Sequence, residues 1–151
     1  MASWKDVEEQ APELAGRARR LFEAHRHKTI ATLRGDGAPR ISGIEARFEA
    51  GELVFGSMPG ARKGADLRRD PRFALHSTSV DPPEDAPATW EGDAKVAGRA
   101  VHTGSLAGEI SGDAFRADVT EVVVTRLNEA ADRLVVDFWR EGTGIRRVER
   151  E

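Results

Sequence analysis

The residues best suited to chemistry lie between positions 56 and 72, in the segment GSMPGARKGADLRRDPR. A strand-like run ends there in Gly-Ser, a Pro-Gly turn follows, and Arg62 and Lys63 fall in the first turn of a short helix expected over residues 61–69. Free backbone N–H groups and the helix dipole favour an anion at this point, and two cations oppose the dipole unless an anion is bound. The pattern therefore indicates a phosphate-binding site, with a solvated basic turn as the alternative interpretation.

The histidines give a weaker indication of a reactive centre. His25 and His27 are two residues apart, which does not place them on one face of a helix, so a metal pair is not expected. His76 and His102 fall on expected strands, where each is interpreted as a hydrogen-bonded structural histidine rather than as a group that meets a ligand. The chain has no cysteine, which excludes a disulfide framework, a thiolate metal site and a cysteine nucleophile.

Length and composition indicate one globular domain over residues 1–151. A chain of 16.5 kDa buries roughly 68% of its unfolded surface, which is enough for a core without disulfides or a structural metal. The net charge of −3 and the pI near 5.9 argue against a nucleic-acid-binding domain. No segment approaches the roughly 20 apolar residues needed to cross a bilayer, and residues 1–9 lack an apolar signal region. We therefore expect a cytoplasmic protein with no nucleic-acid or membrane partner.

The elements that must position the basic pair are mostly short strands. Near the N-terminus, Ser3 is expected to cap a short turn, and apolar residues at three-to-four spacing predict a helix over residues 11–24. Gly35-Asp36-Gly37 then predicts a hairpin between the first two strands. The strands are expected at residues 29–33, 40–48, 53–57, 72–77, 95–102, 119–127 and 133–139.

Three details of this pattern are specific enough to test. Ile41 and Ile44 have opposite phase in the second strand, so a bulge is expected at Gly43, between them. Residues 81–88 and 104–117 are expected to be loops, the latter with about one helical turn. The last two strands are apolar on both faces, which predicts a cover on both, one of them a helix or a second subunit. Strands without βαβ alternation predict a mainly β fold with flanking helices, a closed or nearly closed antiparallel barrel of six to seven strands over about residues 28–141.

The segment around the basic pair resembles the pyridoxamine 5′-phosphate oxidase-like family of FMN-binding split β-barrels. That family has a strand, a short turn, an Arg-Lys pair, a short helix and an Asn/Asp-Pro-Arg, and residues 60–63 and 70–72 reproduce this order. The likeness extends over about residues 27–147. It implies that the strand ending in Gly56 and Ser57 lies along the flavin, and that Arg62 and Lys63 hold the phosphate of the cofactor.

Further residues are assigned by the same resemblance. Arg40 matches an arginine of the second strand, and Ser42 is a candidate for tuning the cofactor ring. The C-terminal segment DFWREG, followed by RRVER, is similar to a signature that supplies a Trp and an Arg to a cofactor bound mainly by the other subunit. Trp139 and Arg147 are the corresponding residues, and a core position is the alternative interpretation of Trp139.

Two departures from the family pattern bear on the reaction. Glu45 stands where the true oxidases have a lysine, and the C-terminal signature lacks its histidine. The oxidation of vitamin B6 itself is therefore not expected. The resemblance favours the small relatives of these oxidases, some of which use FMN and others the deazaflavin coenzyme F-420.

Two functions follow as hypotheses. The first is a homodimeric oxidoreductase that binds FMN or F-420 and transfers a hydride between the cofactor and a small organic substrate. The alternative is a non-catalytic carrier or sensor of a flavin, haem or tetrapyrrole on the same barrel. The homodimer is expected from the two-sided apolar strands and from the exposed sheet edges that a partner would cover.

Overall fold

The chain folds around one antiparallel sheet of eight strands. The computed structural model describes residues 1–106 and 112–151. The strands in chain order are β1 (His27–Leu33), β2 (Pro39–Glu49), β3 (Glu52–Ser57), β4 (Arg72–His76), β5 (Asp93–Ser105), β6 (Asp113–Leu127), β7 (Leu134–Arg140) and β8 (Gly144–Arg150). The helices are α1 (Trp4–Gln10), α2 (Pro12–Glu23), α3 (Arg62–Arg69) and a single 3-10 turn, η1 (Pro87–Thr89).

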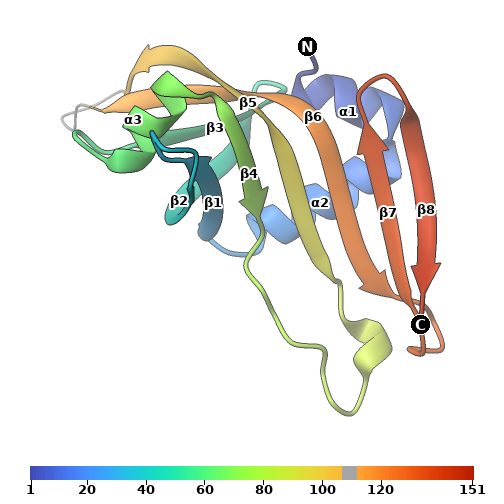
Figure 1. The fold of residues 1–151 in the computed structure, drawn as a ribbon. Helices are drawn as coiled ribbons and strands as arrows, with labels where there is room; N and C mark the ends of the chain where they lie inside the picture. Colours follow the sequence, from blue (N-terminus) through green and yellow to red (C-terminus); the bar gives the residue numbers. More distant parts are fainter. Residues whose placement is uncertain (107–111) are drawn as a thin grey trace.

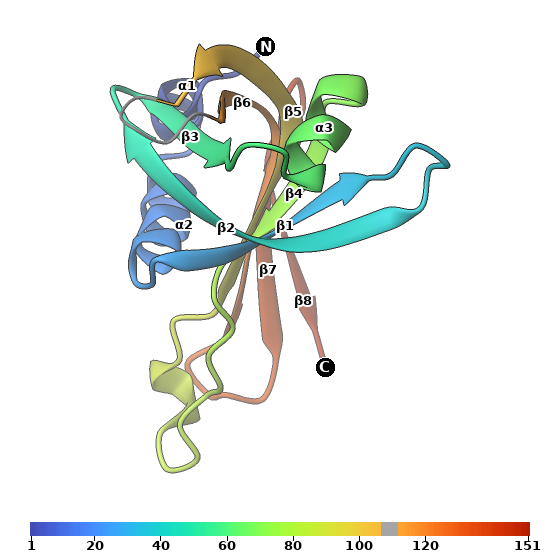
Figure 2. The same ribbon diagram turned by 90° about the vertical axis from the view of Figure 1, so that its left-hand side faces the viewer.

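The first six strands close into a barrel. Their spatial order is β3-β2-β1-β4-β5-β6, and antiparallel pairing of β3 with β6, for example Val54 with Arg116, joins the two ends. β7 and β8 continue the sheet beyond β6 as an extension outside the barrel (Figure 1). Figure 2 shows that α2 and α3 lie well apart, on different sides of the barrel. The predicted mainly β split barrel with flanking helices is therefore confirmed.

The core is one cluster of buried residues that come from the strands of the sheet and from the helices α1, α2 and α3. Trp4 and Val7 of α1 and Phe22 of α2 are buried there, against strand residues such as Val122 and Trp139. Burial of large apolar side chains is the main force that holds these helices to the strands. The predicted helical cover over one face of the last strands is thus present.

The N-terminal segment forms more helix than the sequence predicted. Ser3 caps not a short turn but the seven-residue helix α1, with a capping box in which Ser3 accepts from the Asp6 N–H and the Asp6 carboxylate accepts from the Ser3 N–H. A helix this short is marginal by itself, and burial of Trp4 and Val7 stabilises it. The predicted helix over residues 11–24 corresponds to α2, with Pro12 at its first position.

The first hairpin forms as expected, but its predicted bulge is absent. Gly37 has a φ of 85°, as the tight turn requires, and the Asp36 carboxylate accepts from the Ala38 N–H. The pairing of β1 and β2 runs without interruption through Thr29–Gly43. No bulge is needed because Ile41 keeps the outward phase and remains 76% exposed.

The second half of the sheet is longer than expected. The predicted loop over residues 104–117 gives way to β6 from Asp113 onward, because pairing with both β3 and β5 extends this strand. The helical turn expected in that loop falls largely on residues 107–111, which lie outside the described part of the chain. Residues 144–150 form an unpredicted eighth strand, β8, paired with β7. In the described residues, no helix has the length and apolar character needed to span a membrane.

Candidate functional site

The start of α3 carries two cations and no cap. Arg62 and Lys63 are its first two residues, and Ala61, at the N-cap, offers no side chain to the free N–H groups of the first turn. Arg62 is exposed and Lys63 half-buried, and neither forms an ion pair within residues 1–106 and 112–151. The helix dipole therefore adds to the charge of both side chains, and the combined positive potential favours an anion.

Beneath this turn lies a buried hydroxyl without a partner. Ser57, at the end of β3, is only 3% exposed, and its Oγ has no hydrogen-bond partner among the described residues. A Cβ added to Gly64, the third residue of α3, would lie within 2.2 Å of this Oγ. Glycine at position 64 is therefore what lets the helix approach the strand. A buried polar atom without a partner costs free energy, which an incoming acceptor or donor would recover.

The side of α3 that faces the sheet is fixed by a buried carboxylate, Asp66. One Asp66 oxygen accepts hydrogen bonds from Thr32 Oγ1 at 2.8 Å and from Arg40 Nε at 2.7 Å. The other accepts from Arg69 Nη2 at 2.9 Å. Burial disfavours the charged form, but the hydrogen bonds from Arg40, Thr32 and Arg69 outweigh it and hold the pKa of Asp66 below its usual value. This network sets the position of α3 over β1 and β2.

The network also determines the role of the second-strand candidates. Arg40 gives its Nε to Asp66, and its two terminal nitrogens have no hydrogen-bond partner among the described residues. Asp66 thus orients Arg40 and leaves both terminal groups able to donate. Ser42 lies on the same side of β2, half-buried, two residues further along. Sequence reasoning missed Asp66, although it is the one acid inside the otherwise basic helix RKGADLRR.

A second carboxylate, Asp113, lies at the first residue of β6 beside the same helix. It meets His102 Nε2 at 2.9 Å and Arg68 Nε at 3.6 Å, and one of its oxygens would lie 3.1 Å from a Cβ on Gly64. His102 is therefore a hydrogen-bonded histidine, in agreement with the structural interpretation from sequence. His76 is also hydrogen-bonded, through its Nδ1 and the Ser77 carbonyl oxygen, and its other ring nitrogen is not engaged among the described residues.

Gly56 keeps the neighbouring chain segment close to β3. A Cβ there would lie 2.5 Å from Leu106 and 3.1 Å from the Asp113 carbonyl oxygen. A larger side chain would push these residues away from the strand that ends at Ser57. Gly56 thus permits close packing beside the α3 turn.

Trp139 does not belong to this site, which corrects the prediction from the C-terminal signature. Its side chain is 1% exposed in the core, and its indole Nε1 donates to Gln10 Oε1 at 3.0 Å. The sequence could not decide between core and site, because a Trp at a strand end suits both. Here Gln10, the last residue of α1, meets Trp139, and α2 packs against the same strand, β7.

Arg147 is on β8, on the extension beyond the barrel. Its guanidinium pairs with Asp137, with Nε and Oδ1 2.6 Å apart. The structure thus does not bring Arg147 together with Arg62 and Lys63 of the same chain. A contribution to the site of a neighbouring subunit remains a prediction.

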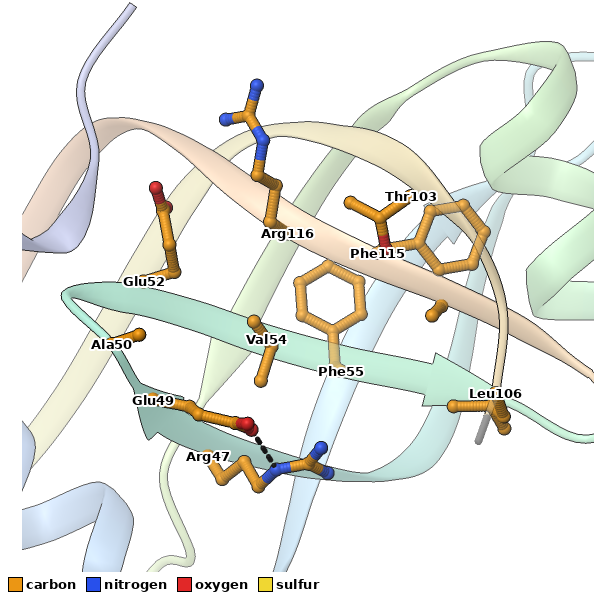
Figure 3. Close-up of a pocket in the computed structure, with 11 residues that line it drawn as sticks. Arg47, Glu49, Ala50, Glu52, Val54, Phe55, Thr103, Leu106, Phe115 and Arg116 are labelled. Atoms are coloured by element: carbon orange, nitrogen blue, oxygen red, sulfur yellow. Dashed lines mark hydrogen bonds and ion pairs between the residues drawn. The ribbon is translucent and has the colours of Figure 1, made fainter. Parts of the chain in front are cut away.

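A shallow groove of about 340 Å³ lies on the outer side of β2, β3 and β6 (Figure 3). Val54 and Phe55 lie at its centre, and Arg47 pairs with Glu49 at its rim, at 2.8 Å. Glu52 adds a second acid to the lining. None of the predicted site residues lines this groove, so we assign it no part in cofactor binding.

Solved structures of other proteins have a fold similar to that of this chain. No protein-family model and no curated protein matches the chain. Among solved structures, a pyridoxamine 5′-phosphate oxidase-related, FMN-binding protein from Nostoc punctiforme is similar, with a TM-score of 0.63, 11% identity and 96% of each chain covered. A heme-binding protein from Mycobacterium smegmatis has a TM-score of 0.54 and 14% identity, over 90% of this chain and 87% of that one.

An F-420 reductase is also similar, with a TM-score of 0.50 and 14% identity, over 64% of this chain and 87% of that one. These likenesses show the architecture: the chain has the same split β-barrel fold as these three proteins. The three similar proteins are named for three different ligands. The fold therefore has to be combined with the local chemistry around α3 before a ligand is proposed for this chain.

Proposed function

We propose that this protein is an oxidoreductase that binds FMN or coenzyme F-420 and passes a hydride between the cofactor and a small organic substrate. The observation that carries the proposal is the start of α3. Two cations that have no ion-pair partner among the described residues, the N–H groups of the first turn and the buried Ser57 hydroxyl meet there within one helical turn. Both cofactors present a phosphate on a flexible chain, which is the group this arrangement fits.

The chain's own residues would bind and orient the cofactor. Arg62, Lys63 and the first N–H groups of α3 hold the phosphate, and Arg40, oriented by Asp66, offers two further donors. The bound cofactor supplies the hydride chemistry. Neither the fold nor the site requires a side chain of the protein to act as an acid or base.

We include a homodimer in this proposal. The face of the last strands that α1 and α2 leave uncovered carries Val123, Val136 and Phe138, half-buried in the single chain, and Val148, which is exposed. Val123 is the cross-strand partner of Phe138, and Val136 is that of Val148, so the four side chains form an apolar strip that runs obliquely over β6, β7 and β8. A second copy of the chain would remove this strip from water, as the two-sided apolar pattern predicts.

Parallel titrations with FMN and with F-420 test the cofactor. Arg62→Ala and Lys63→Ala should each weaken binding by about 1.5–3 kcal/mol, the value of a charged hydrogen bond, while thermal unfolding stays unchanged. Arg20→Ala is the matched control, because Arg20 is an exposed arginine on α2, away from α3. Equal affinity in both α3 variants and the control would move the phosphate site elsewhere.

A carrier of a flavin or of haem is the second candidate, and the likeness to the heme-binding protein over 90% of this chain favours keeping it. A spectrum of the purified protein identifies a bound chromophore. Reduced FMN or F-420 on the protein is then mixed with an acceptor such as a quinone. An enzyme reoxidises the cofactor faster than buffer does, whereas a carrier leaves the rate unchanged.

A further inference from the structure

The outer face of the barrel contains a flat region floored by small side chains, which we call the shelf. It consists of Thr29 and Ala31 on β1, Ala74 on β4 and Ala97 on β5. Ala31, Ala74 and Ala97 are cross-strand partners in one row, and Ile41 of β2 extends that row with a 76% exposed side chain. A cavity of about 690 Å³ lies over these residues. Because the floor consists of methyl groups, a planar apolar group can lie directly on it.

His76 stands at one side of the shelf with one ring nitrogen already engaged. Its Nδ1 contacts the Ser77 carbonyl oxygen, which can only accept, so Nδ1 carries the proton. Nε2 is therefore the nitrogen left for a ligand, and it has no hydrogen-bond partner among the described residues. A backbone contact of this kind fixes the ring orientation before any ligand arrives.

Lys95 is the cross-strand neighbour of His76 and lines the same cavity. Its side chain is exposed and forms no ion pair within residues 1–106 and 112–151. Glu121, the acid on the same face, is engaged with Arg140 at 2.6 Å and so does not neutralise Lys95. The side of the shelf at His76 thus places the Lys95 ammonium group beside the imidazole ring of His76.

We propose that the shelf binds a planar organic carboxylate, with its apolar ring on the alanine row and its carboxylate accepting from Lys95 Nζ and from Nε2 of the protonated His76. The site lies on the opposite face of β1 and β2 from the Asp66 network, since Ala31 and Ile41 alternate with Thr32 and Arg40. It is therefore distinct from the phosphate site at α3. That this ligand is the redox substrate rests on the proposed function, whereas its binding does not.

Binding should depend on pH in a defined direction. The neutral ring of His76 offers only a lone pair at Nε2, whereas the protonated ring donates to a carboxylate, so we expect affinity to be higher in acidic than in alkaline buffer. The other charged groups facing the cavity are His27 and Lys28 of β1, Lys95 of β5 and Glu121 of β6. Lys28 is buried and its amine donates to the Arg26 carbonyl, so it is already engaged.

Calorimetric titration of the full chain with 2-naphthoate, and with the uncharged 2-naphthamide, tests the proposal. We expect naphthoate to bind more tightly, and His76→Gln and Lys95→Gln each to weaken it roughly tenfold, as the loss of a charged hydrogen bond would. His25→Gln and Lys5→Gln are matched controls, since both residues are exposed and lie outside the cavity. In His76→Gln the pH dependence of naphthoate affinity should also flatten.

Several results would overturn the proposal. These are equal affinity for naphthoate and naphthamide, no effect of either variant, or a solution dimer that excludes the probe. Repeating the titration with FMN or F-420 present separates the two proposals. Naphthoate binding without any cofactor binding removes the redox function and keeps the shelf, whereas the reverse result removes only the shelf.

Discussion

Two contacts between a helix and the sheet differ in what holds them. Under α1, the central residue is Trp139, a buried aromatic side chain with a single hydrogen bond to Gln10. Under α3, the central residue is Asp66, a buried carboxylate held by Thr32, Arg40 and Arg69. Apolar burial is insensitive to the exact direction of a contact, whereas a carboxylate fixes the direction of each donor around it. The first contact stabilises the fold, and the second orients the residues beside the proposed phosphate site.

The largest expected effect on the free energy of unfolding comes from the apolar contact at Trp139. Trp139→Ala should lower the free energy of unfolding by about 3–5 kcal/mol, since it leaves a large cavity between α1 and the sheet. Trp139→Phe keeps most of the volume and should lose much less. Urea denaturation measures both. Cofactor affinity of the Phe variant should equal that of the native protein, and a weaker affinity at unchanged stability would restore the role predicted from sequence.

Asp66→Asn should have the next largest effect. It removes the charge that Arg40 and Arg69 face, at a cost of about 2–3 kcal/mol in unfolding free energy, because part of the hydrogen bonding survives. The pKa of Asp66 is lowered in the folded state, so its contribution is complete above its unfolded pKa of about 3.9 and is lost as the pH falls through the folded pKa.

Unfolding free energy measured between pH 2 and pH 7 therefore separates the two contacts. The native protein should lose stability at the acid end more steeply than Asp66→Asn does. Trp139→Phe serves as the control, since its acid limb should run parallel to that of the native protein. Parallel limbs in all three proteins would contradict the assignment of a charged Asp66.

Gly64→Ala should act on binding more than on stability. The new methyl group would meet Ser57 Oγ and displace the hydroxyl beneath the α3 turn. Alanine gains about 1 kcal/mol of helix propensity, which offsets part of the crowding, so unfolding free energy should change by less than about 2 kcal/mol. FMN or F-420 affinity should drop roughly tenfold if the turn holds the phosphate. Gly16→Ala, in α2, is the control for propensity alone.

The smallest effect on stability is expected at Arg147. The Arg147 side chain of its pair with Asp137 is largely exposed to solvent, so Arg147→Ala should leave the free energy of unfolding almost unchanged. The informative measurement is cofactor affinity in the dimer. A loss there at nearly constant stability would support a contribution to the neighbouring subunit, and unchanged affinity would leave Arg147 as a surface residue of β8.

The succession of strands along the chain and the Arg-Lys turn could be predicted because they depend on neighbours in sequence. The hairpin at Gly35-Asp36-Gly37 and the end of α3 before Pro71 depend on backbone restrictions of single residues. The bulge predicted at Gly43 is absent. A glycine in a strand indicates a bulge only where the apolar residues on either side of it must face the same side of the sheet. The sheet leaves Ile41 outside, and no correction is needed.

The sequence by itself determined the barrel, the basic start of α3 and the two-sided apolar strands, since periodicity and turn chemistry are local properties. Only the tertiary structure decided which buried polar groups meet. Asp66 joins Thr32 and Arg40 across 34 and 26 positions, and Trp139 reaches Gln10 across 129. No local pattern encodes such contacts, because they arise from the register of strands and the angle at which each helix crosses them. For that reason the sequence placed Trp139 in the site although it lies in the core, and it did not predict that Arg40 is oriented by Asp66.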